Sequence, residues 1–124
     1  MTKNRGILGI TKELLGKRTK SKDIDLFGSP WKLTFCDEIA VSKDEEEEDS
    51  FKFGLCDGTN RRIAIATKSP DKTEQPIEEI EISTLHELMH AVLKTGQYNH
   101  SNNDEPLVEW LARCVYSLKK QGVI

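Results

Sequence analysis

Residues 83–96, STLHELMHAVLKTG, contain two histidines four residues apart, with a glutamate directly after the first. The chain has 3 histidines in all, and two of them, His86 and His90, fall in this stretch. Apolar residues recur through residues 77–92 at helical spacing, and Gly96 stands where a helix C-terminus is expected. The stretch therefore predicts the second half of an amphipathic helix that begins near Pro76.

Extended segments precede this helix in the sequence, and a second helix follows it. In WKLTF, residues 31–35, apolar and polar residues alternate as in a half-buried strand, after a predicted Gly-Ser-Pro turn at residues 28–30. Residues 51–67, FKFGLCDGTNRRIAIAT, predict a strand, a tight turn and an antiparallel strand. The segment QYNHSNND, residues 97–104, predicts a polar loop, and the second helix begins at Asp104 or Glu105. We therefore predict an α+β fold, with a small antiparallel or mixed sheet of 3–4 strands packed on the histidine-bearing helix and a C-terminal helix.

The length of 124 residues predicts a single domain, which we assign to residues 23–124. Residues 1–22 carry seven basic side chains and one acidic one, and they predict a basic arm with a short helix over residues 4–17. Such an arm could bind nucleic acid, although it lacks the aromatic residues and motifs of that class, so a solvated arm is the favoured interpretation. The acidic run DEEEED at residues 44–49 predicts an exposed loop without an assigned chemistry.

The composition favours a cytoplasmic protein with no membrane partner. The sequence has no apolar run of about 20 residues, as a membrane span would require, and its first 22 residues do not resemble a secretory signal. The odd number of cysteines, 3, has no Cys-x-x-Cys pair and argues against a disulfide framework. We expect the thiols to be reduced and mostly buried, without a nucleophilic or metal-binding role.

The pair of histidines predicts a metal site. On a helix, residues i and i+4 share one face, so His86 and His90 can direct ring nitrogens at one tetrahedral zinc ion. Glu87 projects beside them, where it can act as general base and acid for a zinc-activated water. A catalytic zinc usually has a third protein ligand. The pattern of the metzincins fails, because Leu93 and Gly96 occupy the positions of their glycine and third histidine.

Three residues remain candidates for the third ligand, namely Glu105, Glu109 and His100. In EPLVE, residues 105–109, the two glutamates share one face of the predicted second helix, and a helix packed beside the first could direct both at the metal. Leu107, Leu111, Cys114 and Leu118 would form the adjacent core stripe. His100 lies ten residues after His90, in the predicted loop.

HELMH and EPLVE together resemble the gluzincin class of metallopeptidases. The resemblance implies that Glu105 is the third zinc ligand and that Glu109 hydrogen-bonds His86. Glu109 stands in place of the commoner aspartate, and Pro106 puts Glu105 at the helix edge, so Glu109 could itself be the ligand.

The likeness extends over residues 24–118 to small, often phage-encoded zincin-like proteins and more distantly to ImmA/IrrE-type metallopeptidases. His100 is placed loosely like the third histidine of SprT-type proteases. By the same resemblance, the strand 61–67 would be an exposed edge that pairs with an extended substrate.

Our leading hypothesis is a zinc-dependent metallopeptidase that hydrolyses peptide or protein substrates. The alternative is a zinc-stabilised regulatory or binding module, with a protein or DNA partner and little turnover, and a third is an interaction domain without metal. For Tyr98, His100 and Tyr116, packing or surface roles are favoured over oxyanion stabilisation, and Trp31 and Trp110 are expected to be core anchors. The substrate, the oligomeric state and whether the protein is latent stay open.

Overall fold

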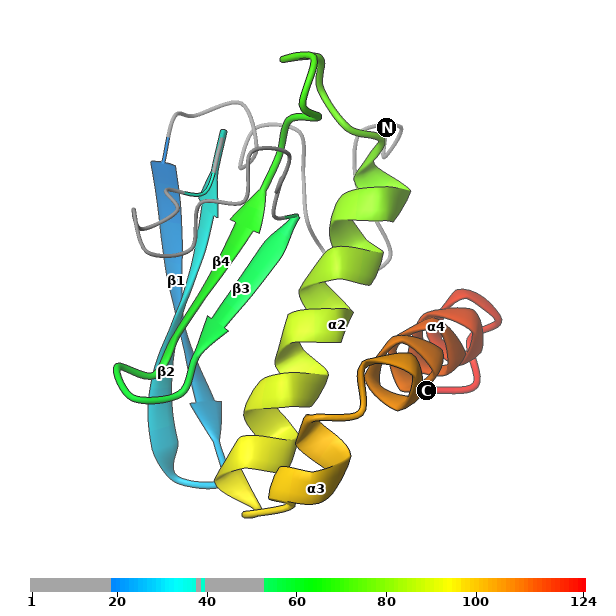
Figure 1. Cartoon of the computed structure of the whole chain (residues 1–124). Coiled ribbons are helices and arrows are strands. Elements are labelled where there is room, and N and C mark those ends of the chain that lie inside the picture. The colour runs from blue at the N-terminus through cyan, green and yellow to red at the C-terminus, as the bar shows by residue number, and fades with distance from the viewer. Residues whose placement is uncertain (1–18, 38, 40–52) are drawn as a thin grey trace.

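The computed structural model describes residues 19–37, 39 and 53–124 (Figure 1). The predicted helix 4–17 and the acidic run 44–49 lie outside these residues. The described chain is an α+β fold, as predicted, with four strands followed by three helices. Their bounds are β1 Thr19–Leu26, β2 Ser29–Cys36, β3 Gly54–Asp57, β4 Arg62–Ala66, α2 Ile77–Thr95, α3 Asn99–Asn102 and α4 Glu105–Lys120.

The sheet is mixed and has the strand order β1-β2-β4-β3. The pairs β1–β2 and β3–β4 are antiparallel, whereas β2 and β4 are parallel. The hairpin predicted at residues 51–67 is therefore confirmed. The prediction that the strand 61–67 forms the edge is wrong, because β4 lies between β2 and β3. Among the described residues, β3 is the edge strand beside the helices (Figure 1).

The first hairpin turns one residue earlier than the predicted Gly-Ser-Pro turn. Leu26 pairs with Ser29, so the turn consists of Phe27 and Gly28. Both have positive φ, 54° and 85°, as a two-residue turn between twisted strands requires. The Asp25 carboxylate accepts a hydrogen bond of 3.2 Å from the Gly28 backbone N–H. Because β1 begins at Thr19, the sheet includes the end of the predicted basic arm.

Helix α2 lies between the sheet and α4 (Figure 1). It begins after Pro76 and is capped by Gly96, as predicted. Glu78 and Glu79 lie in its first turn, where their negative charges stabilise the positive end of the helix dipole. One core joins α2 to the sheet and contains Trp31, Leu33, Phe35, Ile63, Ile65, Ile80 and Ala91. A second core joins α2 to α4 and contains Ile82, Leu85, Ala112 and Tyr116. The two apolar faces of α2 leave a third face for the site.

Helix α4 begins where it was predicted to begin but buries a different face. The Asp104 carboxylate accepts a hydrogen bond from the Leu107 backbone N–H and caps the helix. Its buried residues are Val108, Ala112 and Tyr116, and not the predicted stripe of Leu107, Leu111, Cys114 and Leu118. Trp110 is 63% exposed, so its prediction as a core anchor is also wrong. The face that packs contains Ala112 and Tyr116, which are buried against Ile82 and Leu85 of α2.

The predicted polar loop between the long helices contains a short helix, α3. Its backbone is closed by hydrogen bonds from Asn102 N–H to the Tyr98 carbonyl and from Asn103 N–H to the Asn99 carbonyl. The sequence did not predict α3, because its residues are polar and none of them is buried, so no apolar periodicity marks the helix. Within residues 19–37 and 53–124, no helix has the length and apolar character needed to cross a membrane.

Candidate metal centre

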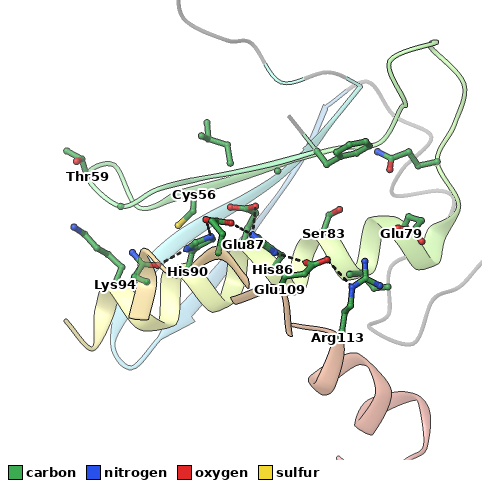
Figure 2. A pocket seen from close by; sticks show the side chains of 18 residues that line it. Cys56, Thr59, Glu79, Ser83, His86, Glu87, His90, Lys94, Glu109 and Arg113 are labelled. Carbon is green, nitrogen blue, oxygen red and sulfur yellow. Dashed lines mark hydrogen bonds and ion pairs between the residues drawn. The ribbon is translucent and has the colours of Figure 1, made fainter. Parts of the chain in front are cut away.

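A cleft of about 720 Å³ separates β3 from the exposed face of α2 and the start of α4 (Figure 2). Phe53, Gly54, Leu55 and Cys56 of the β3 region form one wall. The opposite wall is a single stripe along α2, whose members recur at three- and four-residue spacing: Glu79, Ser83, His86, Glu87, His90 and Lys94. The helical period thus brings both histidines and Glu87 into one cavity opposite an edge strand.

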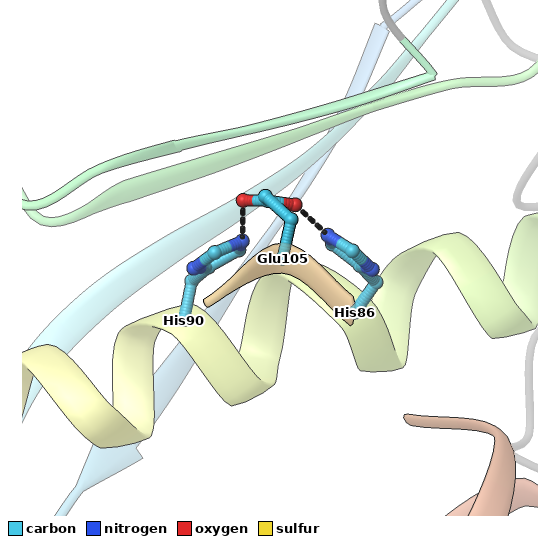
Figure 3. Close-up of side chains that lie close together, drawn as sticks. All are labelled: His86, His90 and Glu105. Atoms are coloured by element: carbon cyan, nitrogen blue, oxygen red, sulfur yellow. Dashed lines mark hydrogen bonds and ion pairs between the residues drawn. The ribbon is translucent and has the colours of Figure 1, made fainter. Parts of the chain in front are cut away.

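Three of the side chains that line this cleft converge. The Glu105 carboxylate lies between the two imidazole rings, with Oε2 at 3.1 Å from His86 Nε2 and Oε1 at 2.8 Å from His90 Nε2 (Figure 3). One ligand atom from each residue lies within 4.8 Å of the others, so that the trio could hold a metal ion. Helix α4 supplies Glu105 from its first residue. The geometry favours Glu105 over Glu109 and His100 as the third ligand.

In both histidines Nε2 faces Glu105, and the partner of Nδ1 indicates which ring nitrogen carries the proton. His86 Nδ1 lies 2.9 Å from Glu109 Oε1, and His90 Nδ1 lies 2.7 Å from Asn102 Oδ1. Both oxygens can only accept, so each Nδ1 carries the proton. In a neutral ring Nε2 is then a lone-pair acceptor, yet it faces a carboxylate oxygen that is also an acceptor. A metal ion, or a proton at each of the two contacts, would satisfy these facing acceptors.

Glu109 acts as the orienting partner of His86, in the role that the gluzincin resemblance implies. Its second oxygen accepts a hydrogen bond of 2.9 Å from Arg113 Nε, one turn further along α4. Burial alone would raise the pKa of Glu109, but the hydrogen bonds from His86 and Arg113 outweigh it and lower this pKa. Burial would likewise lower the pKa of His86, but Glu109, Glu87 and Glu105 raise it. The carboxylates around His86 thus favour positive charge at this position.

Asn102 is a site residue that the sequence reasoning missed. It lies in α3, whose turn places its amide oxygen against His90 while Glu105 follows three residues later. The signal was present, because a metal-binding histidine usually donates its second N–H to a carboxylate or amide oxygen. A search for such a partner near His90 would have included Asn102 and Asn103.

Asn102→Ala should weaken metal binding at this site by about 10- to 100-fold, because the His90 ring loses the acceptor that fixes its orientation. The affinity can be measured by competition with a chromophoric chelator. Asn103→Ala is the matched control, since Asn103 is exposed in the same turn and its N–H pairs through the backbone. Equal affinities for the two variants would contradict an orienting role for Asn102.

Glu87 extends from α2 toward β3 rather than toward solvent. It is 9% exposed, and its Oε2 lies 4.0 Å from His86 Nε2. A Cβ atom built on Gly54 would lie 2.6 Å from Glu87 Cγ, so the carboxyl side chain lies directly against the strand backbone. An isolated glycine within a strand pattern indicates such a close approach, and this signal in FKFGLC was also missed. Glu87 is thereby held between the edge strand and the histidines.

The structure brings one cysteine to the cleft. Cys56 lines it, although the residue is distant from His86 in the sequence. Burial, and secondarily the charges of Glu87 and Asp57, raise the pKa of Cys56 to about 12. A thiol that stays protonated is neither a nucleophile nor a good metal ligand.

Other predicted candidates lie elsewhere. The cleft, as formed by the described residues, is not lined by His100, Tyr98 or Tyr116. His100 is exposed on α3, and Tyr98 is 66% exposed. Tyr116 is buried between α2 and α4, where it hydrogen-bonds Glu81. These positions agree with the packing and surface roles favoured from the sequence.

We compared the chain with protein-family models, with curated proteins and with solved structures, and found no match in any of the three comparisons. Any function assigned to it therefore rests on its own residues and their geometry.

Proposed function

We propose that this protein is a zinc-dependent metallopeptidase. The observation that carries the proposal is the convergence of His86 Nε2, His90 Nε2 and a Glu105 carboxylate oxygen within 4.8 Å of one another. Two imidazole nitrogens and one carboxylate oxygen are a donor set typical of catalytic zinc in peptidases. Each imidazole is also oriented from behind, by Glu109 and Asn102 respectively. The donor chemistry therefore fits zinc better than magnesium or calcium, which prefer oxygen ligands.

The residues beside the ligands supply the proton transfers of peptide hydrolysis. Zinc held by the three ligands would polarise the scissile carbonyl and make a water molecule more acidic. Glu87 takes one proton from that water as its oxygen bonds to the carbonyl carbon. Glu87 then gives the proton to the amide nitrogen as the C–N bond breaks, which yields an acid and an amine. The 4.0 Å between Glu87 Oε2 and His86 Nε2 puts the carboxylate within reach of this chemistry.

The edge strand offers a place for the substrate backbone. Ala66 N–H donates to the Phe53 carbonyl, and Leu55 pairs with Ala64, so alternate residues of β3 direct their backbone groups at β4. Gly54 and Cys56 then direct theirs away from β4. An extended peptide could pair with these groups as an added strand, which would hold it without a deep side-chain pocket. The substrate role that the resemblance gave to β4 thus passes to β3.

Two features favour an enzyme over the alternative zinc-stabilised binding module. A structural zinc site is normally closed by four protein ligands, whereas the convergent group among the described residues has three. A structural site also has no need for a carboxylate such as Glu87 beside its ligands.

The free cysteines Cys36, Cys56 and Cys114 support a reducing, cytoplasmic setting for this activity.

The experiment that tests the proposal combines metal analysis with peptide cleavage. Elemental analysis should find about one zinc per chain. A complex peptide mixture incubated with the protein should show new termini by mass spectrometry, and 1,10-phenanthroline should suppress them until zinc is restored. Failure to take up zinc would overturn the metal site. Zinc uptake without cleavage would favour the binding module.

A further inference from the structure

The edge strand approaches α2 closely at Gly54. A Cβ atom on this residue would lie 2.6 Å from Glu87 Cγ and 2.7 Å from Glu87 Oε2. Real Cβ atoms essentially never approach heavy atoms this closely. An alanine at this position is therefore incompatible with the observed position of the Glu87 side chain, and one of the two must move.

Backbone conformation does not explain the glycine. The described glycines with positive φ are Gly28 and Gly122, and Gly54 is not among them. Gly54 is the first residue of β3 and pairs regularly with Ile65 of β4, in a conformation that any residue could adopt. Glycine in a strand interior ordinarily lowers stability, since it loses more conformational entropy on folding and contributes no packing. What glycine provides here is space for Glu87.

The opposing wall leaves the Glu87 carboxylate few other positions. The side chain is 9% exposed, and Cys56, the next residue on the same face of β3, is close enough for the Glu87 charge to raise its pKa. On α2, His86 Nε2 lies 4.0 Å from Glu87 Oε2. A Cβ at Gly54 would push the carboxylate out of the space between the strand and the histidine.

We propose that Gly54 is a positioning residue that sets where the Glu87 carboxylate lies above the histidine pair. Gly54 acts through the space that its missing side chain leaves for Glu87, and not through the metal. This inference rests on the proposed function, in which Glu87 is the general base. It predicts that the position of the base can be changed without altering the zinc ligands.

Gly54→Ala tests the catalytic part of the inference on one peptide that the wild-type protein cleaves. The kcat should fall about a hundredfold, the cost typical of a catalytic group displaced by about 1 Å. The KM and the zinc stoichiometry should stay close to the wild-type values. A kcat within twofold of the wild type, or a loss of zinc equal to the loss of activity, would overturn the role.

Gly58→Ala is the matched control in the same hairpin. A Cβ there would meet Lys94 Cε at 3.0 Å and Lys94 Cγ at 3.1 Å, which belong to a flexible, exposed side chain that can move aside. Its kcat and zinc content should therefore match those of the wild type. An equal fall in kcat for both variants would indicate a general effect on the hairpin and would contradict a specific role for Gly54.

A thermal double-mutant cycle tests the contact without any activity. Gly54→Ala should lower the Tm of the chain that contains Glu87, because buried atoms must be displaced. In a Glu87→Ala background the clash is gone, and the same substitution should leave the Tm unchanged or raise it, since alanine restricts the unfolded chain. Equal losses of Tm in both backgrounds would overturn the contact.

The two measurements separate the failure of this inference from the failure of the proposed function. If the wild-type protein cleaves no peptide, the peptidase assignment and the catalytic role of Gly54 fall together, whereas the Tm cycle still reports whether Gly54 makes room for Glu87. If the wild type cleaves and the Tm cycle shows no coupling, the positioning role alone is wrong.

Discussion

Replacement of Glu87 with glutamine should reduce peptide hydrolysis by about 100- to 10,000-fold, the range expected when a general acid-base group is removed. Glutamine keeps the size of the side chain and so keeps the packing against Gly54, but its amide cannot accept the proton from water. The histidine and Glu105 donors are untouched, so the zinc stoichiometry should not change. The rate of cleavage and the zinc content, measured on the same sample, check both halves of this expectation.

Glu79→Gln is the matched control for this loss. Glu79 lies on the same cleft-lining stripe of α2 and carries the same charge, but it is exposed and lies two turns before His86. Its variant should retain activity within a small factor. If Glu87→Gln cleaved peptides as fast as Glu79→Gln, the assignment of Glu87 as general base would be wrong, and the binding module would become the better hypothesis.

Glu105→Ala should have the largest effect on the metal. Its carboxylate lies 2.8 Å from His90 Nε2 and 3.1 Å from His86 Nε2, so its removal takes away the only acidic donor that faces both nitrogens among the described residues. We expect zinc affinity to fall by more than the factor of about 10 to 100 typical of an orienting partner. Competition with a chromophoric chelator measures the affinity, and elemental analysis measures the retained zinc.

Variants of the other two candidate ligands, Glu109 and His100, test whether Glu105 is the third ligand. Glu109→Ala should weaken zinc binding by about 10- to 100-fold, because the His86 ring loses its acceptor but the three donors remain. His100→Ala should bind zinc as the wild type does, since His100 is exposed on α3. A larger loss for Glu109→Ala than for Glu105→Ala would exchange the two roles, and a large loss for His100→Ala would contradict the geometry of the site.

The sequence alone determined the elements whose signals are local. The bounds of α2 follow from Pro76, Gly96 and the apolar periodicity between them. The β3–β4 hairpin follows from two extended runs with turn-forming residues between them, although Asp57 still pairs with Arg62 and the turn therefore spans residues 58–61. Spacing on one helix also placed His86, Glu87 and His90 on a common face, because a turn of 3.6 residues is a property of the backbone and does not depend on neighbours.

Only the tertiary structure decided the features that depend on which elements are neighbours. The edge strand is β3, because β4 pairs with β2 as well, and no pattern within residues 61–67 encodes that second partner. Helix α4 packs through Ala112 and Tyr116, because α2 offers it a second apolar face beyond the one that covers the sheet. The periodicity of apolar residues in a sequence predicts that a helix has an apolar face, but it does not predict which element packs against that face.

The same distinction holds within the site. The motif named the two histidines and left the third ligand open among Glu105, Glu109 and His100. The choice follows from the crossing of α4 over α2, which puts Glu105 at Nε2 of both rings and Glu109 at Nδ1 of one. Asn102 and Gly54 likewise gain the roles proposed for them from contacts with residues 12 and 33 positions away in the chain. Local spacing determines what one helix presents, whereas contacts between elements determine which atoms meet it.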